Sequence, residues 1–143
     1  MTYFHVVGVG VGVCVGVGGL QHSRPMAYHA RMFNFHRLDV YKCAITFLSL
    51  AAPLAERAPR GFSALSDQLR RAALSIPLNI AEGSGRFDKD ERRYFGMARG
   101  SALECAAIVD VFQALGAVAE TELVQPRELL ERIVSMLTKL SQE

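Results

Sequence analysis

Apolar residues recur at intervals of three and four positions along most of the chain after residue 37. This spacing places them on one face of a helix, so it predicts amphipathic α-helices rather than strands. Four segments carry such a stripe: Leu38, Tyr41, Ile45, Leu48 and Ala52, widened by Phe47, Leu50 and Leu54; Leu65, Leu69, Ala72, Ala73, Ile76 and Ile80; Tyr94, Met97, Ala98, Ser101, Cys105, Ile108, Phe112 and Leu115; and Leu129, Leu130, Ile133, Met136, Leu137 and Leu140. Four helices joined by short connections predict an all-α protein, an up-down-up-down four-helix bundle.

Residues that favour helix ends delimit the second segment. Ser63 or Ser66 can cap its free N–H groups, and the glycines at 83 and 85 should terminate it. Pro77 lies inside the segment, where it removes one backbone hydrogen bond and should bend the helix. We therefore expect a bent helix that begins near one of the two serines and ends at the glycines.

The third and fourth segments have start signals of their own. Asp88 and Glu91 are spaced like a capping box and predict a helix start at Asp88. Gly96 and Gly100 follow inside that helix, although each glycine costs about 1 kcal/mol relative to alanine. Their spacing puts both on one face, so we expect a closely packed neighbour there. Pro126 suits a first helical turn and predicts the start of the fourth helix.

The first 32 residues do not share the helical pattern. Residues 1–20 contain no charged side chain, and their middle alternates valine with glycine. Glycine disfavours helices and weakens strands, no basic segment precedes the run, and no small-residue cleavage site follows it. We interpret residues 1–32 as a disordered Val/Gly-rich extension, with Met26 and Met32 as alternative starts, and residues 33–143 as the bundle domain. The alternatives are a membrane or targeting element and a tail ordered by a partner.

Charge is distributed unevenly along the chain, whose net charge is +2. Residues 33–143 hold 14 basic and 14 acidic side chains, which balance. Within them, residues 57–99 have a balance of +4 and residues 100–143 a balance of −4. A basic region on one subunit that meets an acidic region on the next would favour head-to-tail assembly.

Side chains suited to metal or nucleotide binding are sparse. All four histidines precede the predicted helices, so the Glu-x-x-His pairs of metal-binding bundles cannot form. Glu82 and Glu104 alone make a poor metal site, and we interpret them as partners of a buried arginine, Arg71 or Arg99. The Gly-Ser-Gly sequence at 83–85 resembles part of a phosphate loop, but it lacks the preceding strand and the following Gly-Lys-Ser/Thr.

The cysteines and serines offer no nucleophile. Cys14, Cys43 and Cys105 contain no C-x-x-C pair, and their odd number argues against a disulfide framework and fits a reducing cytoplasm. Cys43 and Cys105 suit small core positions, and no serine has the context of a nucleophile elbow. The sequence therefore predicts a protein without enzymatic activity, cofactor, bound metal or membrane association.

Three stretches of the chain carry a family signature: residues 68–86 (QLRRAALSIPLNIAEGSGR), 35–41 (FHRLDVY) and 94–104 (YFGMARGSALE). They resemble the four-helix-bundle proteins named after 23S rRNA intervening sequences, over roughly residues 33–140. That family is similar to the accessory variability protein of diversity-generating retroelements, a barrel-shaped homopentamer that binds nucleic acid and a reverse transcriptase. The resemblance therefore implies a homo-oligomer, a pentamer, with RNA or DNA and a reverse transcriptase as partners.

Two sets of side chains are candidates for function. Basic residues on one surface can contact phosphates, which require only charge and reach; these candidates are Arg70, Arg71, Arg86, Lys89, Arg92 and Arg93. Buried polar side chains need partners, and we expect such a set to be hydrogen-bonded in the bundle interior: Asn79, Glu82, Arg99, Ser101 and Glu104. The hypothesis is a non-catalytic, oligomeric, nucleic-acid-binding accessory factor of the cytoplasm. The alternatives are a scaffold that binds only protein and, for the basic set, an ordinary solvated face.

Overall fold

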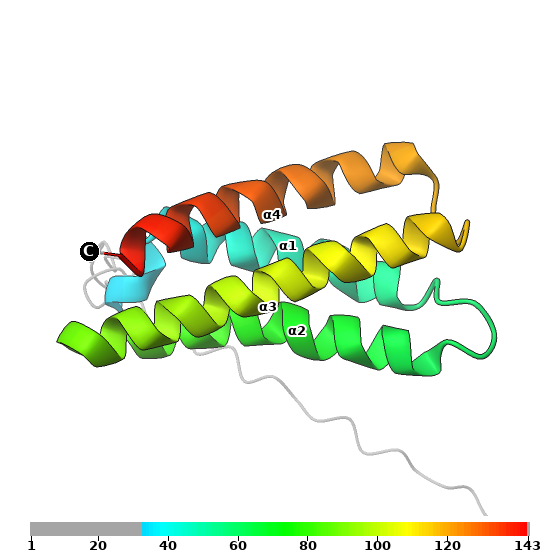
Figure 1. Ribbon diagram of the computed structural model, residues 1–143. Helices are drawn as coiled ribbons and strands as arrows, with labels where there is room; N and C mark the ends of the chain where they lie inside the picture. Colours follow the sequence, from blue (N-terminus) through cyan, green and yellow to red (C-terminus); the bar gives the residue numbers. More distant parts are fainter. Residues whose placement is uncertain (1–32, 143) are drawn as a thin grey trace, which may run out of the picture. The chain divides into compact units, whose positions relative to one another are not determined.

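The computed structural model describes residues 33–142, and the predicted extension over residues 1–32 lies outside them. The described chain contains a short 3-10 helix, η2 (Asn34–Arg37), and four α-helices: α1 (Asp39–Ala55), α2 (Ser63–Gly83), α3 (Asp88–Ala114) and α4 (Glu120–Leu140) (Figure 1). No strand occurs in this part of the chain. The structure thus confirms the all-α class and the four predicted helices.

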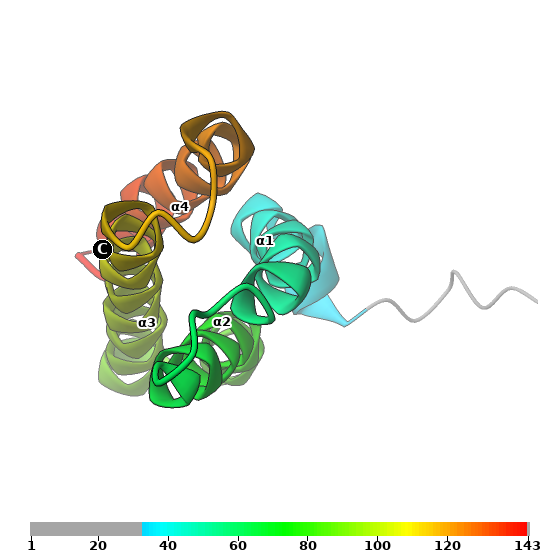
Figure 2. The same cartoon turned by 90° about the vertical axis from the view of Figure 1, so that its right-hand side faces the viewer.

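The four helices enclose a single core. Successive helices pack against each other, and α4 packs against α1, as the end-on view of Figure 2 shows. The connection between α1 and α2 and the connection between α3 and α4 lie at the same end (Figure 1). Arg57, just after α1, joins these connections: its Nη2 donates to the carbonyl of Ala117 at 3.2 Å, and its Nη1 donates to Oε1 of Glu122 at 3.0 Å.

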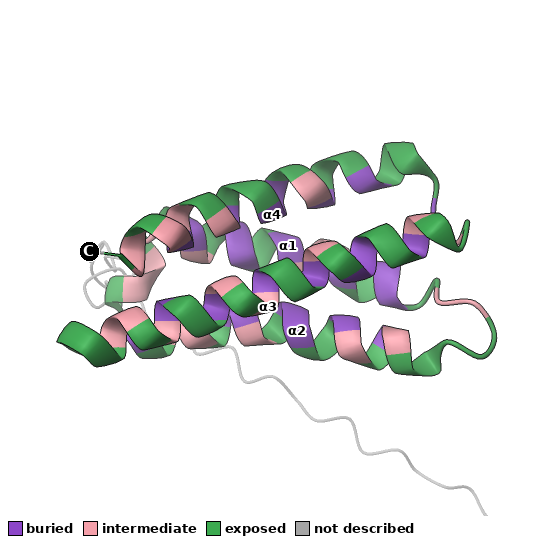
Figure 3. Ribbon diagram, viewed as in Figure 1, coloured by how far each residue is buried: buried purple, intermediate pink, exposed green. Residues whose placement is uncertain are grey.

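Every α-helix contributes buried residues to the core (Figure 3). Each fully buried Leu, Ile or Phe contributes about 1.5–3 kcal/mol relative to an exposed one. The largest fully buried side chains are Phe47 from α1; Leu69, Ile76 and Ile80 from α2; Phe112 from α3; and Leu123, Leu130, Ile133 and Leu137 from α4. This burial makes hydrophobic packing the main stabilising term of the bundle.

The buried face of α1 differs from the predicted stripe. Ile45 is 43% exposed and Ala52 is also exposed. The buried residues include the predicted Phe47 and Leu54, together with Val40, Cys43, Ala44, Ala51 and Ala55. Apolar residues occur nearly all around this helix, so spacing alone allows two faces. The fully buried ring of Phe47 defines the one that is used.

The start of α4 also differs from the prediction. Pro126 was expected to open this helix, but the helix begins at Glu120 and Pro126 is buried inside it. The backbone N–H of Ala119 donates to Oε2 of Glu122 at 3.2 Å, which satisfies one of the free groups at the helix start. A carboxylate at the third helical position therefore sets this boundary.

Two predicted helix caps do not form. α2 begins at Ser63, but no side chain caps it, so neither Ser63 nor Ser66 has the expected role. α3 begins at Asp88 as predicted, yet the Asp88–Glu91 capping box is absent. Asp88 has a φ of 55°, a left-handed conformation that costs energy for a residue with a side chain. The predicted end of α2 at Gly83 is confirmed.

The glycines of α3 do not face a neighbour within the described chain. A Cβ atom at Gly96 or Gly100 would meet no heavy atom within 4 Å, so the expected close neighbour is absent there. The close approach occurs at Gly83 of α2, which is buried against Phe95 and Tyr94 of α3. The two glycines of α3 lie on the outer surface instead.

Candidate functional site

The turn between α2 and α3 presents an aromatic ring to solvent. Phe87 is 85% exposed, the largest exposed fraction among the big apolar side chains of the described chain. Its backbone is extended, and the left-handed Asp88 follows it. Arg86 and Lys89 lie close by in the sequence and are exposed. The result is a protruding ring flanked by cations.

Arg86, which precedes Phe87 in the sequence, is held in place by two contacts. It forms an ion pair with Glu82 one turn earlier, and its guanidinium lies 5.7 Å from the centre of the Tyr94 ring. The hydrogen bond and charge of Glu82 raise the pKa of Arg86 above its usual value, so the group keeps its proton. Much of its positive charge is therefore matched by a carboxylate.

The six basic candidates fall into two sets. Arg70 and Arg71 lie on the exposed surface of α2, and Arg71 precedes the end of that helix at Gly83 by about 18 Å along the axis. The other set surrounds the α2–α3 turn and comprises Arg86, Lys89, Arg92 and Arg93. Lys89 and Arg93 are exposed and take part in no ion pair within residues 33–142. These two are the cations of the turn that are available to a partner.

The polar set predicted for the interior is distributed differently. Glu82 and Glu104 are exposed rather than buried, and neither pairs with a buried arginine. Gln68 donates to Glu104, and Arg71 donates to Gln68 at 2.5 Å. Arg71 and Glu104 are thus linked through the amide of Gln68 on the surface between α2 and α3.

The smaller polar residues join α2 to α3 directly. The Ser101 hydroxyl donates to the Ser75 hydroxyl at 2.9 Å, and Asn79 Nδ2 donates to the same Ser75 oxygen at 2.9 Å. All three side chains are half-buried. Arg99, also half-buried, donates from Nε to the hydroxyl of Thr138 on α4 at 2.9 Å. These residues are hydrogen-bonded at the margin of the core rather than within it, and the partner of Arg99 is Thr138 rather than the expected Glu82 or Glu104.

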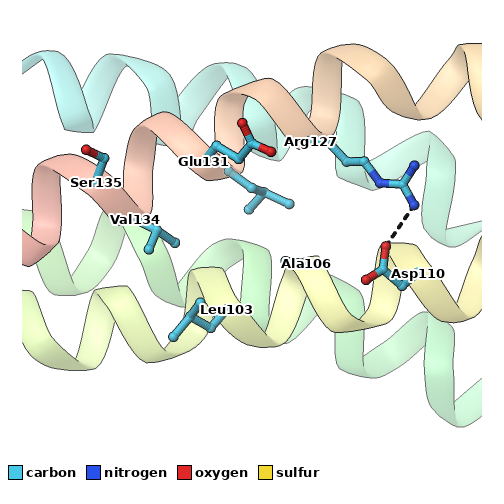
Figure 4. Close-up of a pocket in the computed structure, with 8 residues that line it drawn as sticks. Leu103, Ala106, Asp110, Arg127, Glu131, Val134 and Ser135 are labelled. Carbon is cyan, nitrogen blue, oxygen red and sulfur yellow. Dashed lines mark hydrogen bonds and ion pairs between the residues drawn. The ribbon is translucent and has the colours of Figure 1, made fainter.

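A groove of about 460 Å³ runs between α3 and α4 (Figure 4). Its apolar lining consists of Leu103 and Ala106 from α3 and Leu130 and Val134 from α4. Leu103 is 45% exposed, and Val134 points toward α3 in Figure 4. The groove is therefore large enough and apolar enough to accept side chains of a partner.

Charged residues border this groove. Arg127 Nη2 donates to Asp110 Oδ1 at 2.7 Å and to Gln113 Oε1 at 2.5 Å, which closes one end (Figure 4). Glu131 also lines the groove, is exposed, and takes part in no ion pair within the described chain. The border thus offers one carboxylate without a cation.

The outer surface of α2 carries a second apolar feature. Leu74 and Leu78 are 48% and 59% exposed, and their four-residue spacing places them one above the other on the helix. Arg71 precedes Leu74 by almost one turn. We call Leu74 and Leu78 the α2 ridge. On α3, Met97 and Leu115 were predicted to be buried but are exposed.

The part of the chain that the structure describes contains two free thiols and no cluster of metal ligands. Among residues 33–142, no three His, Cys, Asp or Glu side chains come together in a way that could hold a metal ion. Cys43 and Cys105 are buried free thiols, as predicted. Burial raises the pKa of Cys105 to about 12, with a smaller contribution from Glu104, so its thiolate is disfavoured.

The described residues form a bundle of four α-helices. The chain belongs to the 23S rRNA-intervening sequence protein family, whose model matches residues 36–139. The family resemblance inferred from the signature stretches is thereby confirmed. No curated protein matches the chain. None of the described helices combines the length and apolar character needed to cross a bilayer.

Sequence reasoning missed Phe87, the α2 ridge and the α3–α4 groove. Phe87 could have been noticed as a lone aromatic residue between charged neighbours, outside every apolar stripe. Leu74 and Leu78 fall on the opposite face from the stripe that includes Leu69 and Ile76, and this mismatch is a readable signal of an outer apolar surface. The groove gave no such signal, because it depends on how α3 and α4 pack.

Proposed function

We propose that this protein is a non-catalytic, oligomeric accessory factor of the cytoplasm that binds single-stranded nucleic acid at the α2–α3 turn. The observation that carries the proposal is the exposed ring of Phe87 at a turn that is followed, within six residues, by Lys89 and Arg93, two exposed cations with no ion pair among residues 33–142. A partner that covers this ring would remove apolar surface from water, which stabilises the complex.

The chemistry of this turn suits single strands. Each base of a single strand has an open π-face, and stacking on an aromatic side chain is worth about 1–3 kcal/mol per base. Lysine and arginine next to the ring attract the adjacent phosphates, with an affinity that falls as salt rises. Phe87 would supply the stacking contact, and Lys89 and Arg93 would supply the phosphate contacts.

The family resemblance supports the oligomeric part of the proposal. A homopentamer with a reverse transcriptase as its partner is the arrangement implied by similarity to the retroelement accessory protein. The exposed leucines of α2 and the apolar groove are surfaces that assembly would cover. A pentamer is therefore the assembly that we propose.

A scaffold that binds only protein is the second candidate. It is favoured by the balance of charge at the turn, where residues 82–93 hold four basic and four acidic side chains. Nucleic acid would meet carboxylates as well as cations on this surface. The groove and the α2 ridge serve a protein partner equally well.

Fluorescence anisotropy with labelled single-stranded RNA and DNA distinguishes the two candidates. Phe87→Ala should weaken binding roughly tenfold without changing its salt dependence, and Lys89→Glu with Arg93→Glu should weaken binding and reduce that dependence. Phe33→Ala and Arg132→Glu, at exposed positions of the same types elsewhere, are the matched controls and should bind normally. If the unaltered protein binds neither strand at low salt, the nucleic-acid hypothesis is wrong and the scaffold is favoured.

A further inference from the structure

Two apolar surfaces of the bundle have complementary shapes. The α2 ridge projects two leucines from a convex helix surface, and the α3–α4 groove is a concave surface of about 460 Å³ with an apolar lining. A helix face that lays residues i and i+4 into a groove between two helices is a common mode of helix recognition. The α2 ridge and the groove thus match as ligand and receptor.

The charges beside the two surfaces are also complementary. Arg71 lies next to the ridge and is exposed, and within residues 33–142 its side chain bonds only to the neutral amide of Gln68. Glu131 lies on the groove and has no ion pair among residues 33–142. Docking the ridge in the groove would bring an unpaired cation of α2 to an unpaired carboxylate of α4.

We propose that the α2 ridge of one copy of this chain occupies the α3–α4 groove of the next copy. The proposal rests on the oligomeric part of the proposed function and specifies its interface. Two different surfaces of the chain meet in such a contact, so it is heterologous: each copy offers one ridge and one groove. Contacts of this kind build closed rings when the rotation between copies closes, which is consistent with a cyclic assembly.

Single substitutions at exposed positions disrupt each side of this contact without disturbing the core. Leu78→Asp places a carboxylate on the ridge, and Leu103→Asp places one in the groove; both leucines are substantially exposed. Ile45→Asp, at a 43% exposed position on α1, is the matched control because it lies outside both surfaces. Circular dichroism should show that all three variants of the full chain remain helical.

Size-exclusion chromatography with light scattering then measures the mass. We expect the unaltered chain and Ile45→Asp to be oligomers of equal mass, and Leu78→Asp and Leu103→Asp to be monomers, with association weakened at least a hundredfold. An equal mixture of the two monomeric variants is the decisive sample. Leu78→Asp retains an intact groove and Leu103→Asp an intact ridge, so the mixture should form a dimer and nothing larger.

The charge pair gives a second test of the same contact. Arg71→Glu alone and Glu131→Arg alone should each weaken the oligomer, because each places like charges together. The double variant restores opposite charges in reversed order and should recover most of the assembly. Recovery would not occur if the two residues were remote from each other in the oligomer.

Three results of the mass measurements would contradict the proposed contact. A monomeric unaltered chain at all concentrations would overturn both the oligomeric part of the proposed function and this interface. An oligomer that persists in both Asp variants, or dissociates equally in Ile45→Asp, would overturn the interface alone. Two monomeric variants that fail to pair on mixing would show that ridge and groove do not meet, leaving another occupant, such as a different protein, for each.

Discussion

Gly83 of α2 packs directly against Phe95 of α3. A Cβ atom at Gly83 would lie 3.0 Å from Cε1 of Phe95 and 3.1 Å from Cβ of Tyr94. These distances are tighter than nine in ten real Cβ contacts, and the Phe95 ring that would have to shift by a few tenths of an ångström is itself buried in the core. Glycine at this position therefore lets the end of α2 approach the first turns of α3.

Replacing Gly83 with alanine should destabilise the protein. The added methyl group forces the Phe95 ring or the α3 backbone to move, and such overpacking typically costs about 1–3 kcal/mol. Alanine favours the helix by up to about 1 kcal/mol, which offsets part of this cost. We expect Gly83→Ala to lower the free energy of unfolding measured by urea denaturation.

The control for this experiment is Gly96→Ala. A Cβ atom at Gly96 meets nothing within 4 Å, so only the helix preference of alanine remains, and this variant should gain about 0.5–1 kcal/mol. The two substitutions are chemically identical and should have opposite signs. Equal changes in both variants would contradict the close packing at Gly83.

The sequence predicted the helices well because their stripes are regular. In α2 and α4 the predicted stripes form most of the observed buried faces. In α1 the prediction was right for Phe47 and Leu54, which are buried, and wrong for Ile45 and Ala52, which are exposed. Apolar residues surround this helix, so spacing alone does not select one side. The prediction for the two glycines of α3 was wrong for a related reason. Their four-residue spacing shows that two residues without side chains share one helix face, but it does not show whether another helix packs against that face.

The candidate site was predictable only in part. The basic residues around the α2–α3 turn could be read from the sequence, but their pairing could not: Arg86 is matched by Glu82, whereas Lys89 and Arg93 are not. Which cation remains available depends on side-chain geometry. The groove between α3 and α4 requires residues about 30 positions apart to face each other, such as Leu103 and Val134, and no local pattern encodes that pairing.

The hydroxyl pair between α2 and α3 should make a measurable contribution. Ser101 donates to Ser75 at 2.9 Å where both side chains are half-buried, and a hydrogen bond of this kind contributes about 0.5–1.5 kcal/mol. In a double-mutant cycle, Ser75→Ala and Ser101→Ala should show a coupling free energy within that range. Ser49→Ala, on the exposed side of α1, is the control: its effect on the free energy of unfolding should add to that of Ser75→Ala or Ser101→Ala without coupling. Full additivity of the first pair would contradict the contact.

The ion pair between Arg57 and Glu122 should make stability depend on pH. The hydrogen bond and charge of Arg57, together with the Ala119 N–H, lower the pKa of Glu122 below the usual value of a glutamate carboxyl group. A carboxyl group with a lowered folded-state pKa contributes stability above its unfolded-state pKa and loses it as pH falls through the folded-state value. The melting temperature of Glu122→Gln should lie below that of the unaltered protein at neutral pH and converge with it in acid.

The control for the pH experiment is Glu128→Gln. Glu128 is exposed on the same helix and takes part in no ion pair within the described chain. Its variant should follow the melting curve of the unaltered protein across the whole pH range. If the melting temperatures of Glu122→Gln and the unaltered protein differ by the same amount at every pH, the charge of Glu122 contributes nothing to stability.

Cys105 should resist alkylation until the protein unfolds. Burial raises the pKa of its thiol from 9.0 to about 12, so the thiolate fraction near pH 8 falls roughly a thousandfold relative to an unfolded cysteine. We expect mass spectrometry after treatment with iodoacetamide to find Cys105 unmodified in buffer and modified in urea. The background variant Cys14→Ser removes the thiol that lies outside the described residues. Rapid alkylation of Cys105 in buffer would mean that the α3 core opens far more often than its packing indicates.

The raised pKa of the Cys105 thiol should also affect stability at high pH. The thiol of the unfolded chain loses its proton at a lower pH than the buried thiol of the folded chain, so the free energy of unfolding should fall as pH rises from about 9 toward 12.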